Sequence, residues 1–288
     1  TNLDEEVLDG VVISNTGGST VNSASILVSA YEGLRGFQDQ DKMFALDEMS
    51  TDALVGPTRG GDWDDNAKWR QLHTHTWAPD NIEIRNAWNS LLSQVHNCNL
   101  VIDNGTPAQV AQARFLRALA YFDLVRYYGR VPLTLVPQTI SEAMSTPQSE
   151  AVEIYEKVII PDLEYAVGSL TEEPKDYLGR KSASGRATLT AAKALLGRVY
   201  LTMAGFPLYD ETKKELAREL LEEVIDYADA TGKFWAKNAS EWQRMWINEN
   251  DNKYHIFEIQ YIVAKDYGNP MVFHSVPRLP SKYVTLEM

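Results

Sequence analysis

Residues 113–125, with the sequence ARFLRALAYFDLV, and residues 128–133, with the sequence YGRVPL, carry the most informative pattern in this chain. Apolar side chains recur around them with the spacing of one helix face, at Ala111, Phe115, Ala118, Phe122 and Val125. This spacing predicts a helix over residues 108–128. Gly129 is typical of a residue just past a helix end, and Val131-Pro132 is expected to be extended, because a residue before proline disfavours the helical region.

Outward from this helix, the chain carries further start and stop signals. Gly105 is typical of a helix end, Thr106 of an N-cap, and Pro107 of a first helical position. The same periodicity predicts other helices over residues 22–34, 84–103, 150–170, 186–203 and 214–228. Pro161 should kink the third of these, and residues 255–262 alternate as a short strand would.

Together these segments predict a mostly α fold of tetratricopeptide-like helical hairpins, with long irregular loops and little β structure. The helix over 186–203 is rich in alanine and includes Gly197, so a neighbouring helix should approach it closely. We expect residues 1–288 to form a single domain of this kind.

Composition excludes several classes of protein. The chain has 288 residues, of which 44% are hydrophobic and 23% charged, with a formal net charge of −13. An acidic chain of this kind is not expected to bind nucleic acid, since phosphate contacts need clustered Lys and Arg, nor to dock electrostatically on an anionic membrane. No stretch approaches the roughly 20 apolar residues of a membrane span. Cys98, the single cysteine, can form neither an internal disulfide nor a multi-thiolate metal site.

A tryptophan-rich segment, residues 53–82, has few aliphatic residues and many polar ones, and is expected to be a long loop. Indole rings pack on the C–H faces of sugars, while carboxylates, amides and guanidinium groups pair with hydroxyls. The predicted ligand-binding residues of this loop are Arg59, Asp62, Trp63, Asp64, Trp69 and Trp77. The alternative is that these indoles only pack the loop against the helices. A second cluster, Trp235, Trp242 and Trp246, is interpreted as core packing, since the last two are four residues apart.

Signatures of catalysis and of metal binding are weak. The sequence has no nucleophile elbow, phosphate-binding loop, dinucleotide fingerprint or His-Glu-x-x-His motif. His73 and His75 could share one side of a strand, but no third metal ligand lies nearby in sequence. Residues 62–66 (DWDDN) resemble the start of a calcium loop, yet Ala67 stands where that loop needs glycine. We therefore expect no enzyme activity and no cofactor, with a non-standard Ca²⁺ site left open.

An ordered set of segments resembles the SusD/RagB family of outer-membrane nutrient-binding lipoproteins. The most specific match is 113–125 with 128–133. The other matching segments, in chain order along nearly the whole chain, are 48–52, Trp88 with Asn97 and Asn99, 152–163, 185–187 with 191–201, and 255–258. Within the hallmark helix we read Phe115 and Phe122 as packing residues, and we expect Arg114 and Arg117 to pair with carboxylates or to cap neighbouring helices.

This resemblance implies a surface-exposed, lipid-anchored protein of the outer membrane that captures oligosaccharides and passes them to a SusC-like TonB-dependent transporter. It implies ligand contacts in the tryptophan-rich loop, with Asp62, Trp63 and Trp77 carried over by position. Residues 56–63 (GPTRGGDW) are also similar to members that serve fructans. The family's lipidated cysteine is not in this chain, and family chains are longer, so the C-terminal part of the family fold is expected to be lacking.

Alternatives to glycan capture remain open at this point. The same family includes members that capture peptides, and an acidic chain suits neutral glycans or cationic peptides better than acidic polysaccharides. A scaffold that only binds other proteins, with the tryptophan-rich loop buried, is the second alternative. A glycoside hydrolase is the third, but with 40 acidic residues no particular pair of carboxylates is evidence for it.

Overall fold

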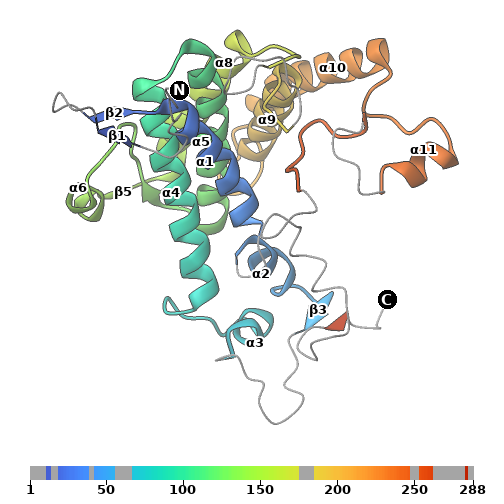
Figure 1. Cartoon of the computed structure of the whole chain (residues 1–288). Helices are drawn as coiled ribbons and strands as arrows, with labels where there is room; N and C mark the ends of the chain where they lie inside the picture. Colours follow the sequence, from blue (N-terminus) through green and yellow to red (C-terminus); the bar gives the residue numbers. More distant parts are fainter. Residues whose placement is uncertain are drawn as a thin grey trace, which may run out of the picture. The chain divides into compact units, whose positions relative to one another are not determined.

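The computed structural model describes residues 11–13, 19–38, 42–55, 67–174, 185–246, 253–261 and 283–284. Its contacts define two compact units, a larger unit within residues 1–31 and 94–260 and a smaller unit within residues 32–93 and 261–288. The described part is mostly helical with three short pairs of strands, which confirms the predicted fold class (Figure 1).

The helices are α1 (Ser23–Phe37), α2 (Met43–Glu48), α3 (Lys68–His73), α4 (Ile82–Asn104), α5 (Pro107–Tyr128), α6 (Ile140–Ser145), α7 (Ala151–Ile154), α8 (Ile160–Ser169), α9 (Leu189–Met203), α10 (Lys213–Thr231) and α11 (Ala239–Arg244). The strand pairs are all antiparallel: β1 (Val11–Ile13) with β2 (Ser19–Val21), β3 (Leu54–Val55) with β6 (Tyr283–Val284), and β4 (Val131–Pro132) with β5 (Gln148–Ser149).

Helix α5 begins and ends where the sequence predicts. The hydroxyl of Thr106 accepts a hydrogen bond from the backbone N–H of Gln109, and the Gln109 side chain accepts one from the backbone N–H of Thr106. This reciprocal capping box satisfies two of the helix's free donors, and Pro107 occupies the first turn, where no donor is needed. At the other end Gly129 has a φ of +70°, which a side chain would disfavour.

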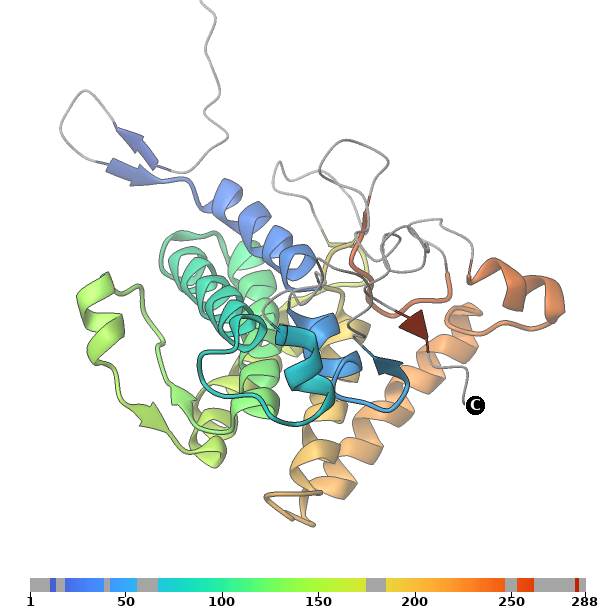
Figure 2. The ribbon, with the colours of Figure 1, turned by 90° about the horizontal axis from the view of Figure 1, so that it is seen from below.

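The larger unit is a series of helices in which α5 packs on α8, α8 on α9, and α9 on α10. Both views show α9 and α10 side by side (Figures 1 and 2). At their contact, a Cβ atom on Gly197 would lie 2.8 Å from Cγ of Leu221. The predicted close approach at this glycine is therefore confirmed, and it depends on the missing side chain.

Pro161, where the sequence predicts a kink, follows closely on a π-helical turn over Tyr155–Ile159, between α7 and α8. Proline has no N–H to donate to the carbonyl four residues earlier, that of Lys157. A wider turn immediately before it replaces a sharp break, and the chain continues as a helix to Ser169.

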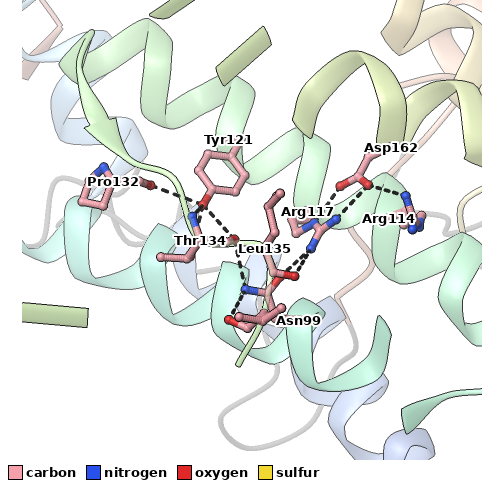
Figure 3. Close-up of polar contacts among 9 residues, drawn as sticks. Asn99, Arg114, Arg117, Tyr121, Pro132, Thr134, Leu135 and Asp162 are labelled. Atoms are coloured by element: carbon pink, nitrogen blue, oxygen red, sulfur yellow. Dashed lines mark hydrogen bonds and ion pairs between the residues drawn. The ribbon is translucent and has the colours of Figure 1, made fainter. Parts of the chain in front are cut away.

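A buried ion pair connects α5 to α8 in the larger unit (Figure 3). The Arg117 guanidinium donates to both carboxylate oxygens of Asp162, from Nε to Oδ2 at 2.7 Å and from Nη2 to Oδ1 at 2.9 Å. Arg114 adds a third bond, from Nη1 to Oδ1 at 3.0 Å. Burial raises the pKa of the Asp162 carboxyl, and the two arginines oppose that rise. The expected pairing of both arginines with a carboxylate is confirmed.

The same network holds the chain after β4. Arg117 Nη1 also donates to Oδ1 of Asn99 at 2.6 Å and to the carbonyl of Leu135 at 3.1 Å. The Asn99 amide then donates to the carbonyls of Thr134 and Val136, at 3.1 and 3.2 Å. The Tyr121 hydroxyl accepts from the backbone N–H of Thr134 at 2.8 Å. Polar side chains from α4 and α5 thus fix the course of an extended segment that has few backbone partners of its own (Figure 3).

The smaller unit has its own hydrophobic cluster, formed by Ala45, Met49, Trp69 and Leu72. Phe44, Leu46, Leu54 and Ile84 pack against it, so the cluster joins α2, β3, α3 and the start of α4. The predicted loop over residues 53–82 therefore includes one short helix, α3, and one short strand, β3.

The short strand predicted over 255–262 is wrong for the residues that the structure describes there, which form bends and irregular backbone without a ladder. Their side chains are used for packing instead. The ring of Phe257 meets that of Phe115 edge-on at 5.2 Å, and Gln260 packs over Gly185. A strand is defined by pairing with a partner strand, and none of the strand pairs includes the described residues of this segment.

Removal of Arg117 should destabilise the larger unit far more than removal of an exposed arginine from the same helix. We expect Arg117→Met to lower the free energy of unfolding by about 3 kcal/mol or more, because it leaves the buried carboxylate of Asp162 with Arg114 as its one remaining arginine partner. The matched control is Arg126→Met, which loses an ion pair to Asp123 and should cost about 1 kcal/mol or less. Urea denaturation followed by circular dichroism measures both, and equal losses would contradict this account.

The helix contact at Gly197 predicts opposite results for one substitution at two glycines. Gly168→Ala in α8 should raise the free energy of unfolding by up to about 1 kcal/mol, because nothing lies within 4 Å of the added Cβ and alanine favours helix. The free energy of unfolding of Gly197→Ala should be lower than that of Gly168→Ala by about 1 kcal/mol or more, because Leu221 must move to make room for the added Cβ. The same denaturation experiment compares the two, and a Gly197→Ala variant as stable as Gly168→Ala would refute close packing here.

Candidate functional site

Four of the six predicted ligand-binding residues lie outside the described residues: Arg59, Asp62, Trp63 and Asp64. The calcium-like motif of residues 62–66 also lies there. Trp69 and Trp77 are described, and both belong to the smaller unit.

Trp69 is an interior residue of the smaller unit. Its exposed fraction is 6%, and it packs in the cluster with Met49 and Leu72. The ammonium group of Lys68 lies 4.8 Å from the centre of its ring. This position matches the alternative reading, in which an indole of the tryptophan-rich segment packs the interior.

Trp77 is open to solvent, with an exposed fraction of 44%. The imidazole of His75 lies beside it, with ring centres 5.2 Å apart and planes inclined at 54°. Of the two described tryptophans of the segment, Trp77 is the one that a ligand can reach, and it forms a two-ring surface with His75. The sequence indicated His75 only as a weak metal candidate, because two residues spaced two apart carry no signal that their rings will touch on an irregular turn.

The backbone just before Trp77 forms a turn after α3 that is closed by three backbone hydrogen bonds. The N–H groups of Thr74, His75 and Thr76 donate to the carbonyls of Arg70, Leu72 and Gln71 at 2.8, 3.1 and 2.9 Å. His75 has a φ of +55°, in the left-handed region that costs a non-glycine residue energy. Such a conformation persists only where the surroundings determine it, so the backbone that carries the ring pair has a defined course.

Asn81 ties the far end of this turn to α3 and to α4. Its side-chain amide donates to the carbonyl of Lys68 and to Oε1 of Gln71, both at 3.1 Å. Its Oδ1 accepts from the backbone N–H of Glu83 at 3.0 Å, which caps α4. The ammonium of Lys68 lies 2.7 Å from Oε1 of the buried Glu83. The exposed indole therefore stands on a turn anchored at both ends.

Groups that could hold a metal ion do not converge in the described part of the chain. No set of three or more His, Cys, Asp or Glu side chains in the described ranges is arranged to hold a metal ion. His73 and His75 lie on a helix end and a turn, not on a strand, and His73 Nδ1 contacts the carbonyl of Thr51 at 3.2 Å. Burial raises the pKa of the Cys98 thiol, so it stays protonated and is a poor nucleophile.

The second tryptophan cluster was predicted as core, and this prediction is wrong. Trp235, Trp242 and Trp246 have exposed fractions of 45%, 56% and 70%. The spacing of four residues does bring Trp242 and Trp246 into contact, with ring centres 5.8 Å apart. Contact between neighbours on one helix face says nothing about whether a second element covers that face.

None of the helices in the described ranges combines the length and the apolar character needed to span a bilayer.

Comparison with known proteins identifies the family. A SusD-like family model, described as "Starch-binding associating with outer membrane", matches residues 8–201. A SusD-like protein of Bacteroides ovatus is 30% identical over 187 residues, 60% of this chain and 33% of the relative. SusD-like protein P38 of Formosa agariphila is 27% identical over 215 residues, 68% of this chain and 39% of the relative.

Solved structures agree with the fold. A SusD homolog from Bacteroides thetaiotaomicron superposes with a TM-score of 0.68 at 23% identity, over 86% of this chain and 48% of that one. A protein named as a laminarin-binding SusD-like protein gives a TM-score of 0.56 at 28% identity, over 70% of this chain and 42% of that one. The chain thus spans less than half the length of each of these relatives. With two thirds of its residues inside the family match and the hallmark helix α5 among them, the chain belongs to the SusD-like family.

Proposed function

We propose that this chain captures oligosaccharides without chemically changing them, at a surface centred on Trp77. The observation that carries the proposal is the exposed indole of Trp77, which His75 flanks and an anchored turn supports. An indole face packs against the C–H groups of a sugar ring, and a fixed ring loses little conformational freedom when it binds. The starch-binding description of the family and the name of the laminarin-binding relative support a glycan as the ligand.

The polar residues of the same segment supply the chemistry that stacking lacks. We assign hydrogen bonds with sugar hydroxyls to Arg59, Asp62 and Asp64, and a further stacking contact to Trp63. Trp69 contributes by packing α3, which carries the turn. Capture by these contacts needs no cofactor, and a Ca²⁺ ion at residues 62–66 is the one addition that the sequence suggests.

In the cell, this capture would serve uptake. We propose that the full protein is held at the surface of the outer membrane by a lipid anchor, where it delivers the glycan to a SusC-like TonB-dependent transporter. The family description supports the outer-membrane location. The net charge of −13 favours a neutral glycan, and we keep fructan-like chains among the candidates because of residues 56–63.

Replacement of Trp77 tests the proposal. The chain is run through native gels that contain starch, laminarin, xyloglucan, inulin or levan, and at least one polysaccharide should retard it. Trp77→Ala should weaken that retardation about fivefold or more, because a stacked aromatic ring contributes about 1 kcal/mol. Its stability should change by less than about 0.5 kcal/mol, because the side chain lies at the surface.

The matched control is Phe206→Ala, which removes an exposed ring of the larger unit, one that pairs with Tyr209 on the turn between α9 and α10. It should leave retardation unchanged. Retardation that survives Trp77→Ala in every gel would exclude the Trp77 surface. Binding of cationic peptides with no retardation by any polysaccharide would instead support a peptide-capturing member of the family.

A further inference from the structure

A second exposed aromatic surface lies in the larger unit, far along the sequence from Trp77. Three indoles within twelve residues are between 45% and 70% exposed: Trp235, Trp242 and Trp246, here called the α11 ridge. Tryptophan is usually well buried, so three exposed side chains in one short segment call for a ligand or partner.

The segment that carries the α11 ridge is held in a defined conformation. Glu241 accepts from the backbone N–H of Lys237 at 2.8 Å and from the ammonium of Lys253 at 3.0 Å. These two donors lower the pKa of the Glu241 carboxyl, so it stays charged near neutral pH. The backbone N–H of Phe234 donates to the carbonyl of Lys253 at 2.7 Å, and Asn238 caps α11. These hydrogen bonds order the backbone that carries the α11 ridge.

The chemistry around the α11 ridge fits a sugar. Across residues 232–246 the exposed large apolar side chains are all indoles, whose flat faces can pack on the C–H groups of sugar rings. Beside them, the amide N–H groups of Asn238 and the side chains of Gln243 and Arg244 have no hydrogen-bond or ion-pair partner within the described residues. Hydrogen-bond donors without a partner can bind sugar hydroxyls, and the indole faces can pack on sugar C–H groups.

We propose that the α11 ridge is a second glycan-stacking surface, which binds at least two successive sugar residues. The planes of Trp242 and Trp246 meet at 70°, so one flat sugar ring cannot lie against both. Each indole therefore receives its own residue of the chain, and a monosaccharide gains only one of the two contacts. This inference rests on the proposed function in one respect, that the ligand is a glycan, but it requires no contribution from Trp77.

Fluorine NMR on the full chain labelled with 5-fluorotryptophan tests the α11 ridge directly. Trp→Phe variants assign the resonances of Trp77, Trp242 and Trp246, and maltoheptaose, laminarihexaose and a xyloglucan oligosaccharide are titrated in turn. We expect the Trp242 and Trp246 resonances to shift saturably with at least one oligosaccharide, and much less with glucose at the same concentration. In affinity gels the double variant Trp242→Ala/Trp246→Ala should bind the retarding polysaccharide at least about fivefold more weakly. Phe206→Ala should bind it as strongly as the unchanged chain does.

The outcomes separate the two proposals. If Trp77 shifts while Trp242 and Trp246 do not, the α11 ridge is not a glycan surface and the proposed function stands. If Trp242 and Trp246 shift while Trp77 does not, the ridge is supported and the Trp77 surface is excluded. If no resonance responds to any oligosaccharide, both proposals fail. Shifts of the ridge resonances that depend on protein concentration and not on sugar would overturn the ridge in favour of self-association.

Discussion

The packing of the larger unit depends on one carboxylate, that of Asp162 in α8. Arg117 and Arg114 of α5 bind it from a single helix face, and Arg117 continues to Asn99 of α4 and to the backbone after β4. Because a buried charge without partners is very unfavourable, α4, α5, α8 and the segment 132–136 can adopt only arrangements that keep these bonds. The network thus specifies the arrangement of the helices more than it adds net stability.

Around this network, shape decides how the remaining helices pack. The missing side chain of Gly197 lets α10 approach α9, and a π-helical turn accommodates Pro161 without ending the helical stretch. The polar residues that do carry a charge inside are paired, as Asp162 and Arg117 show. The exposed indoles of the described residues lie on turns and short helices, not on this series of long helices.

The tryptophans show how strongly context decides the role of one residue type. Trp69 and Trp77 are eight positions apart, yet their exposure differs. Trp69 packs in the hydrophobic cluster of the smaller unit, whereas Trp77 is open to solvent beside His75. Trp242 and Trp246 touch one another as their spacing predicts, but their outer faces remain open. Each exposed indole lies on a segment fixed by side-chain bonds, by Asn81 in one unit and by Glu241 in the other. Support of this kind lets an exposed ring bind without first being ordered.

The sequence by itself determined the long helices and the ends of α5, because a cap such as Thr106-Pro107, a terminator such as Gly129 and an apolar stripe act over a few residues. It also predicted that Arg114 and Arg117 would pair with carboxylates or cap neighbouring helices, and the first of these is what the structure shows. Only the tertiary structure chose Asp162, 45 residues beyond Arg117, and only it decided which indoles are covered. Burial and pairing depend on neighbours that are distant along the chain, and no local pattern records where those neighbours will lie.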